Sequence, residues 1–350
     1  MNKMIKKIIF LFTILLVFIF WKTRESTLKT IEAFYFWENN RGSLSEFELK
    51  KLKELDTKKM YVKLFEVEKN EENEIIPTAK SQLKLTKNEI LSIEIIPTIY
   101  IRNNVFKNSS KKELIELSEN LHYLILKRYR DNFKLSIPTL KEIQIDCDWT
   151  ESTKGNYFIF LKNLNKIATQ QISATLRLYA YKFPNKMGIL PVDRAMLMCY
   201  NLLSPIESGN RNSILELEEL EKYLIGSKEY PLPLDVAIPI YSSIHIYQNN
   251  KFKGILYGQT NDFIKKTRTL KGLWHTIKCD TLINEIYIRK GDKIKYENNS
   301  PNKIKKAIDI IKSNVIFDEQ STIALYHLQE IELKQYTHEE LVSFYTFFKH

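Results

Sequence analysis

Strand-like and helix-like segments alternate along nearly the whole chain after Thr30, and this alternation limits the fold more than any other sequence feature. Alternation of this kind is typical of a parallel sheet whose strands are connected by helices. The eight candidate strands span residues 31–37, 59–67, 93–101, 141–149, 172–180, 195–200, 234–240 and 322–328. Their number and the chain length predict one α/β domain over residues 31–350, a (β/α)8 TIM-type barrel.

An open, doubly wound sheet is the alternative arrangement of these segments. It would need a glycine-rich phosphate-binding turn after its first strand. The chain has only nine glycines, and neither GxGxxG nor GxxxxGK[ST] occurs. The sequence therefore favours the barrel and predicts no nucleotide cofactor.

Helix signals separate most of the candidate strands. The pattern predicts helices over 44–55, 111–130 and 157–168, and Ser43 is available to cap the first. Capping boxes begin two helices, at Ser110–Glu113 and at Ser213–Glu216. Pro301 begins another helix, and Thr337 with Glu340 caps the last. The region after residue 240 is expected to be irregular, with one hairpin that turns at Asn249 and Asn250.

The first 24 residues have the layout of a membrane-targeting segment. Lysines precede an uncharged run over residues 8–21, and two more basic residues follow it. No small-residue cleavage site and no cysteine for lipid attachment follow, so we expect residues 1–24 to remain as an anchor, with Trp21 at the interface. Residues 25–30 would be a short linker. The leading lysines predict that the rest of the chain lies on the exported side of the membrane.

The chain has a formal net charge of +11 and three cysteines. We expect its lysines to be spread over the predicted helices, a pattern typical of a solvated surface that favours anionic lipid or acidic glycans over nucleic acid. The cysteines are widely separated and form no CxxC pair, which predicts neither a disulfide framework nor a zinc site. Cys147 and Cys199 lie in apolar runs and are expected to pack in the core.

The fourth candidate strand, KEIQIDCDW, has an unusual polar face. Strand alternation places Gln144, Asp146, Asp148 and Thr150 on one side. Polar groups on a strand buried on both sides are costly unless they are paired or functional. We therefore predict that Asp146 and Asp148 are catalytic residues at the mouth of the barrel, where active sites of this fold lie. The structural alternative is that both acids are hydrogen-bonded inside the barrel and only stabilise it.

The segment IQIDCDWT resembles the fourth-strand signature of chitinase-like glycoside hydrolases of family 18, which ends in DxDWE. The resemblance implies that Asp146 and Asp148 match two family acids and that Trp149 matches the tryptophan. Thr150 occupies the position of the family's catalytic glutamate. Glu151 comes one residue later and would point the other way on a regular strand.

A longer resemblance covers the fourth to the seventh candidate strands. The segments EIQIDCDWTEST (142–153), SATLRLYA (173–180), VDRAMLMCYN (192–201) and YPLPLDVAIPIYS (230–242) are similar to an uncharacterised family of exported bacterial proteins with a glycosidase-type barrel. This resemblance implies the fold and an exported setting at a membrane surface. It implies no particular reaction.

Aromatic and amide side chains gather at the ends of the candidate strands. Such groups suit the apolar faces and the hydroxyl groups of sugar rings. The predicted substrate-binding residues are Trp37, Gln144, Arg177, Tyr179, Tyr200, Asn201 and Tyr241. Further strand-end candidates are Tyr35, Tyr100, Arg102, His245, His327 and Gln329, and a second carboxylate would come from Glu32, Glu66 or Glu151.

Two hypotheses for the function follow. In the first, the barrel hydrolyses carbohydrate, Asp148 is the acid or the stabilising carboxylate, and Asp146 tunes its pKa through like-charge coupling. In the second, the barrel is a non-catalytic binder of an envelope glycan or a protein, because Thr150 replaces the glutamate. A metal site of Asp146, Asp148 and a histidine is weaker, since the six histidines form no HxH or HExxH motif. We predict no cofactor.

Overall fold

The computed structural model describes residues 30–349, except for residues 87, 90, 91, 228, 259, 260, 284 and 285. The predicted anchor over residues 1–24 and most of the linker over residues 25–30 lie outside this range. Within the described range, no helix has both the length and the apolar character needed to cross a bilayer.

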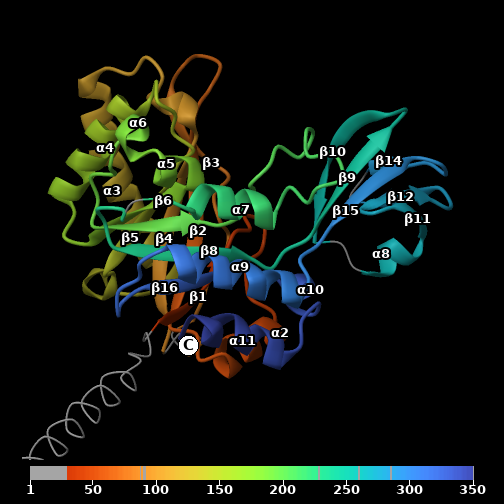
Figure 1. The fold of residues 1–350 in the computed structure, drawn as a ribbon. Coiled ribbons are helices and arrows are strands. Elements are labelled where there is room, and N and C mark those ends of the chain that lie inside the picture. The colour runs from red at the N-terminus through yellow and green to blue at the C-terminus, as the bar shows by residue number, and fades with distance from the viewer. Residues whose placement is uncertain are drawn as a thin grey trace, which may run out of the picture.

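Eight parallel strands close into a barrel, because β1 pairs with β16 on one side and with β2 on the other. This closure confirms the (β/α)8 barrel and excludes the open sheet (Figure 1). All eight predicted strands are present. They are β1 (Ile31–Phe36), β2 (Lys59–Lys69), β4 (Glu94–Ile101), β5 (Glu142–Asp146), β6 (Gln171–Arg177), β7 (Arg194–Met198), β8 (Leu234–Pro239) and β16 (Thr322–Tyr326).

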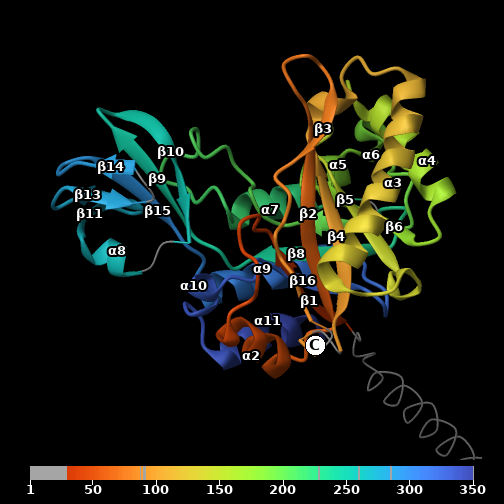
Figure 2. The same cartoon turned by 180° about the vertical axis from the view of Figure 1, so that it is seen from behind.

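Helices connect the strands and cover the outside of the barrel (Figures 1 and 2). They bury apolar stripes against the sheet, such as Leu114, Leu121 and Ile125 of the longest helix. The helices are α2 (Glu46–Glu54), α3 (Lys111–Phe133), α4 (Lys154–Ile167), α5 (Leu178–Lys182), α6 (Pro184–Met187), α7 (Leu217–Leu224), α9 (Pro301–Asn314), α10 (Glu330–Leu333) and α11 (His338–Lys349), with 3-10 turns η1 (Asn103–Phe106) and η2 (Ile137–Thr139).

Three of the six predicted helix starts are correct. The Ser110–Glu113 capping box begins α3, Pro301 begins α9, and Thr337 exchanges hydrogen bonds with Glu340 at the start of α11. In these three cases the signal lies within the first turn of the helix, so the local backbone alone brings the groups into position.

Two predicted caps are wrong. The α2 cap is Ser45, which forms a capping box with Glu48, rather than Ser43. The Ser213–Glu216 box does not form: α7 begins at Leu217, and Ser213 donates from its backbone N–H and its hydroxyl to the carboxylate of Glu297. A charged acceptor from a distant segment replaces the local partner in this second case.

Residues 243–297 form an insertion between β8 and α9, with a core of their own. The prediction of an irregular region was wrong here, although the turn at Asn249 and Asn250 is confirmed, with φ values of 52° and 58°. Five strands form an antiparallel sheet in the order β10-β9-β15-β12-β11. The elements are β9 (Ser243–Gln248), β10 (Lys251–Tyr257), α8 (Asn261–Lys265), β11 (Thr267–Lys271), β12 (Trp274–Ile277), β15 (Lys293–Glu297) and the separate hairpin of β13 (Thr281–Ile283) and β14 (Ile286–Ile288).

The second strand is irregular where it passes the barrel mouth. Pro97 of β4 faces β2, and the pairing between these strands shifts at Leu64, so the bulge predicted at Pro97 lies on the neighbouring strand. The shift turns both Lys63 and Glu66 towards the barrel interior. Beyond it, β2 continues into a hairpin with β3 (Ile75–Thr78).

Candidate functional site

Asp146 and Asp148 lie at the mouth of the barrel, where the parallel strands end. Asp146 is the last residue of β5 and is 7% exposed; its carboxylate accepts a hydrogen bond of 2.6 Å from the Thr175 hydroxyl on β6. Asp148 lies in the following loop, with 45% of its side chain exposed, and pairs with Nε of Arg177 at 2.5 Å. The mouth therefore contains one buried carboxylate and one accessible ion pair.

Burial, and after it the negative charge of Asp148, raises the pKa of Asp146 from 3.8 to about 6. The Thr175 hydrogen bond and the charges of Arg177 and Lys63 act in the opposite direction but do not cancel these effects. Desolvation penalises the charged form, and a like charge nearby does the same. The carboxyl group of Asp146 therefore changes its protonation state close to neutral pH.

We expect Asp146→Asn to flatten the dependence of stability on pH. The folded-state pKa of Asp146 is raised, so the folded chain retains a proton between pH 4 and 6 that the unfolded chain has lost. The stability that this proton contributes is lost as the pH rises through about 6. Asparagine stays neutral, so the variant should be more stable than the wild type by about 1–2 kcal/mol at pH 8, with a smaller difference at pH 5. Denaturant unfolding at both pH values measures this, and parallel curves would contradict it.

Gln144 lies one layer below the acids, inside the barrel. It is fully buried, and its side-chain oxygen accepts hydrogen bonds from the hydroxyls of Tyr35 at 2.7 Å and Thr98 at 3.3 Å. These contacts tie β1, β4 and β5 together. We interpret Gln144 as a residue that supports the mouth from beneath rather than one that contacts a ligand.

Tyr326, at the end of β16, is the centre of an aromatic cluster. Its ring stacks on Tyr200 with a centroid distance of 4.7 Å, and Tyr241 approaches it edge-on at 5.6 Å. Trp37 lies 6.0 Å from the same ring. The structure thus brings together three of the predicted substrate-binding residues around a tyrosine that the sequence analysis did not select.

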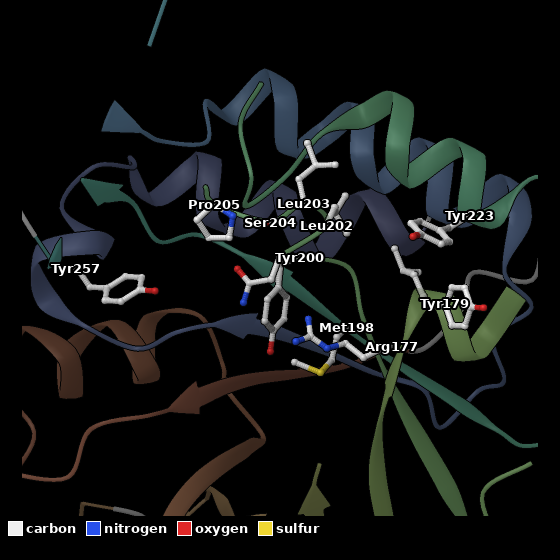
Figure 3. Close-up of a pocket in the computed structure, with 12 residues that line it drawn as sticks. Arg177, Tyr179, Met198, Tyr200, Leu202, Leu203, Ser204, Pro205, Tyr223 and Tyr257 are labelled. Carbon is white, nitrogen blue, oxygen red and sulfur yellow. The ribbon is translucent and has the colours of Figure 1, made fainter. Parts of the chain in front are cut away.

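An open pocket of about 510 Å³ lies beside this cluster (Figure 3). Arg177, Met198 and Tyr200 meet at its centre, while Tyr179 and Tyr223 lie on one side and Tyr257 of the insertion on the other (Figure 3). Four predicted residues line it: Arg177, Tyr179, Tyr200 and Asn201. Asn201 also accepts a hydrogen bond from the Tyr241 hydroxyl. The insertion therefore supplies one wall of the pocket.

Among the three candidates for a second carboxylate, Glu66 is the one near the mouth. Strand register places Glu66 beside Tyr100, and Tyr100 beside Asp146. Neighbouring strands are about 4.8 Å apart, so the backbones at Glu66 and Asp146 are about 10 Å apart. Glu66 is held by Lys63 at 2.7 Å and by Arg102 at 3.3 Å.

The other two candidates lie elsewhere. Glu32 is near the start of β1, at the opposite end of the barrel. Glu151 is exposed in the loop after β5 and pairs with Lys186 at 3.3 Å. Neither carboxylate faces Asp146.

The loop after β5 uses its other motif residues structurally. Trp149 is buried against Tyr157 of α4, with ring centroids 5.4 Å apart. Thr150 is exposed, and its hydroxyl contacts those of Ser152 and Thr153 in the turn before α4. The position that the family 18 resemblance assigns to a catalytic glutamate therefore holds a neutral turn residue.

The remaining strand-end candidates lie in three places: near the acids, at the insertion and beside the aromatic cluster. Tyr100 stays near the acids, and burial raises its pKa to about 12. His245 lies inside the insertion against Ser243, while His327 is buried beside the aromatic cluster, where burial lowers its pKa to about 4. Gln329 packs against Gly258 of the insertion. The predicted strand over residues 322–328 extends past the true end of β16 at Tyr326, which is why His327 rather than Tyr326 was a strand-end candidate.

The described residues contain no group of three His, Cys, Asp or Glu side chains that could hold a metal ion. Cys147 and Cys199 are buried and Cys279 is exposed. Burial raises the pKa of both buried thiols, which agrees with a packing role.

Solved structures with a similar fold include two spore cortex-lytic enzymes and a domain of a putative chitinase. The spore cortex-lytic enzyme SleL of Bacillus megaterium QM B1551 matches with a TM-score of 0.54 and 12% identity, over 91% of this chain and 75% of that chain. The C-terminal domain of a putative chitinase from Desulfitobacterium hafniense DCB-2 also gives 0.54, with 11% identity, over 92% of this chain and 100% of that one. These matches support the barrel fold of this chain.

SleL of Bacillus cereus is similar at a TM-score of 0.50, with 12% identity over 88% of this chain and 74% of that chain. No family model and no curated protein matches the chain. The likeness to these structures concerns the barrel fold, while membership of family 18 or of the exported family remains a prediction.

Proposed function

We propose that this chain is an exported, membrane-anchored barrel whose mouth binds carbohydrate at the cell envelope without hydrolysing it. The observation that carries the proposal is the loop after β5. Thr150 replaces the acid, Glu151 pairs with Lys186 on the surface, and Asp148 is already paired with Arg177. Glycoside hydrolysis needs a protonated acid beside the leaving oxygen and a second free carboxylate. The residues of the loop after β5 do not supply this pair.

The mouth is well suited to hold a sugar. Tyr179 and Tyr257, which are 40% and 55% exposed, offer aromatic rings, and Arg177 and Asp148 offer a donor and an acceptor at fixed positions. Sugar rings have apolar faces edged by hydroxyl groups, so this combination recognises them. Pairing of Asp148 with Arg177 holds both side chains in place before a ligand arrives, which lowers the entropic cost of binding.

The proposed anchor would direct the mouth away from the bilayer. Residues 1–24 lead into β1 at Ile31, the end of the barrel where the strands begin. Asp148 lies at the opposite end. The ligand that this arrangement favours is therefore a polysaccharide of the envelope, and not a glycolipid headgroup in the same membrane.

Hydrolysis is the second candidate, and two observations favour it. Asp146 has a pKa of about 6, which suits a group that donates a proton near neutral pH, and Glu66 lies two strands away. Against it, Lys63 and Arg102 both hold Glu66. Asp146 is also buried beneath Asp148.

Asp148→Asn tests the binding proposal on the purified full-length chain. The substitution keeps the shape of the side chain and removes the charge that holds Arg177. We expect affinity for the best ligand in a panel of envelope oligosaccharides to fall about ten-fold, the value of one charge-assisted hydrogen bond. Isothermal titration calorimetry measures it. Glu151→Gln is the matched control, because it neutralises an exposed carboxylate of the same loop, and should bind like the wild type.

The same samples separate the two candidates. Under the binding proposal, the wild-type chain releases no shorter sugar from any bound oligosaccharide after prolonged incubation, as chromatography would show. Release of product that is abolished by Asp146→Asn, with binding retained, would establish the hydrolase instead. Equal affinity of Asp148→Asn and the wild type would remove the mouth as the binding site.

A further inference from the structure

The net positive charge is concentrated in two parts of the chain. Residues 243–297, the insertion, have eleven Lys and Arg and five Asp and Glu, and residues 1–24 have five basic residues and no acid. The rest of the chain contains 37 basic and 37 acidic residues. In the described structure, the excess of positive charge belongs to the insertion.

The two faces of the insertion sheet differ. One face packs on a core that includes Ile246 and Ile294. On the other face, the half nearest the barrel is covered: Lys295 is buried there and donates to the Ser208 hydroxyl at 2.6 Å and to the Arg211 carbonyl at 2.7 Å. The half farther from the barrel is open, and it lies to one side of the barrel (Figures 1 and 2).

Aromatic and cationic side chains share this open half. Tyr247 lies 5.0 Å from Trp274 and 5.6 Å from Phe252, measured between ring centroids, and all three rings are partly exposed. Register places Lys293 opposite Tyr247. A hollow of about 300 Å³ lies here, and we call its lining the outer aromatic patch: Tyr247, Asn250, Leu270, Trp274 and Lys293.

We infer that the outer aromatic patch binds an acidic polysaccharide, at a site separate from the mouth. The rings of Tyr247 and Trp274 provide surfaces for the apolar faces of sugar rings. Lys293 is exposed and held by the side-chain oxygen of Asn250 at 3.1 Å, so its ammonium is placed beside the rings with hydrogens left to donate. The net charge of the insertion attracts an anionic chain, since the barrel itself is neutral.

The polysaccharide is favoured over a lipid surface for a geometric reason. The insertion follows the end of β8, so it lies at the mouth end of the barrel, opposite the start of β1. This inference rests on the proposed function, because it assumes an anchor at residues 1–24 and glycan ligands. The patch and the mouth would then hold a long chain at two points. Once one site has bound the chain, the other site meets it at a higher effective concentration.

The test uses the full-length chain and polygalacturonate as the acidic probe, with neutral dextran of similar length as its counterpart. We expect the chain to bind polygalacturonate more tightly than dextran at 50 mM NaCl and to lose most of this preference at 500 mM, because salt screens exposed charges. Trp274→Ala should weaken polygalacturonate binding about ten-fold, and Lys293→Gln should weaken it less and reduce its salt dependence.

Matched controls are available on the barrel. Tyr123 is an exposed aromatic of α3 and Lys112 an exposed lysine of the same helix, and Tyr123→Ala and Lys112→Gln should bind like the wild type. Trp274→Phe, which keeps a ring, should retain most of the affinity, and circular dichroism of Trp274→Ala checks that this variant is folded.

The result that overturns the inference is equal binding of polygalacturonate by the wild type and Trp274→Ala. Binding of anionic vesicles or single-stranded DNA at least as tight as polygalacturonate, and equally sensitive to Trp274→Ala, would also overturn it. The mouth is tested separately, because Asp148→Asn should weaken the binding of short oligosaccharides, whereas Trp274→Ala should leave that binding unchanged. Failure of binding at one site therefore does not contradict binding at the other.

Discussion

Replacing Arg194 with methionine is expected to lower the free energy of unfolding by about 3–5 kcal/mol at pH 8.5, the cost of leaving a buried charge without its partner. Arg194 is 6% exposed and lies at the start of β7. Its guanidinium contacts the fully buried Asp235 at 3.2 Å and Asp318 at 2.7 Å. Methionine fills similar space but supplies no charge, so Asp235 would have to remain charged without a partner or take up a proton.

The loss should depend on pH in a definite direction. Burial raises the pKa of Asp235 to about 7, even though Arg194 acts to lower it. Without Arg194 the pKa rises further, so the variant continues to lose stability above pH 7, where the wild type no longer does. The gap between wild type and variant should therefore be smaller at pH 6 than at pH 8.5. Urea unfolding at both values measures it.

Two comparisons complete this test. Arg211→Met removes a half-exposed arginine paired with Glu219 on the surface and should change stability by less than about 1 kcal/mol. The double variant Arg194→Met, Asp235→Asn removes the unpaired charge and should recover part of the loss. A gap that does not change between pH 6 and 8.5 would show that lost packing, and not the charge on Asp235, explains the effect.

Glu297→Ala is the second change with a large expected effect, because it leaves the Lys295 ammonium buried without its carboxylate. The two groups are 2.6 Å apart, and both side chains are almost fully buried. Glu297 also accepts both hydrogen bonds of Ser213. We expect a loss of about 3–5 kcal/mol and faster hydrogen exchange at Ser213, since the loop before α7 is no longer attached to the insertion.

The location of the exchange distinguishes this effect from general unfolding. Protection should fall in the loop that contains Ser208 and Ser213 and in β15, while β5 and β6 at the barrel core remain protected. Asp280→Ala, which removes an exposed carboxylate within the insertion, should leave the exchange pattern of that loop unchanged. Uniform loss of protection across barrel and insertion would contradict a local attachment role for Glu297.

The parts of the site that the sequence predicted share one physical basis. Asp146 and Asp148 follow a strand in a barrel, and parallel strands place their ends on one face, so their position at the mouth follows from topology. Arg177 and Tyr200 meet there for the same reason. Gln144 was assigned to this group by alternation, which gives the direction of a side chain but not its depth in the barrel.

The features that the sequence did not reveal depend on contacts between segments that are far apart along the chain. In β10 and β11, exposed lysines interrupt the apolar alternation, so these strands do not resemble barrel strands. Tyr326 becomes central because three rings from three other strands meet on it. No local pattern contains this information, since the pairing energy comes from residues far away along the chain.

The sequence by itself determined the eight strands of the barrel, the helix starts set by partners three residues apart, and the acids at the end of β5, because each depends on local periodicity or hydrogen bonds. Only the tertiary structure decided that Asp148 is paired with Arg177, that Ser213 donates a hydrogen bond to Glu297 rather than capping a helix, and that the insertion lines part of the pocket. These features depend on burial and on charge pairs between segments that are far apart in the sequence. The interactions can therefore form only when the barrel has closed.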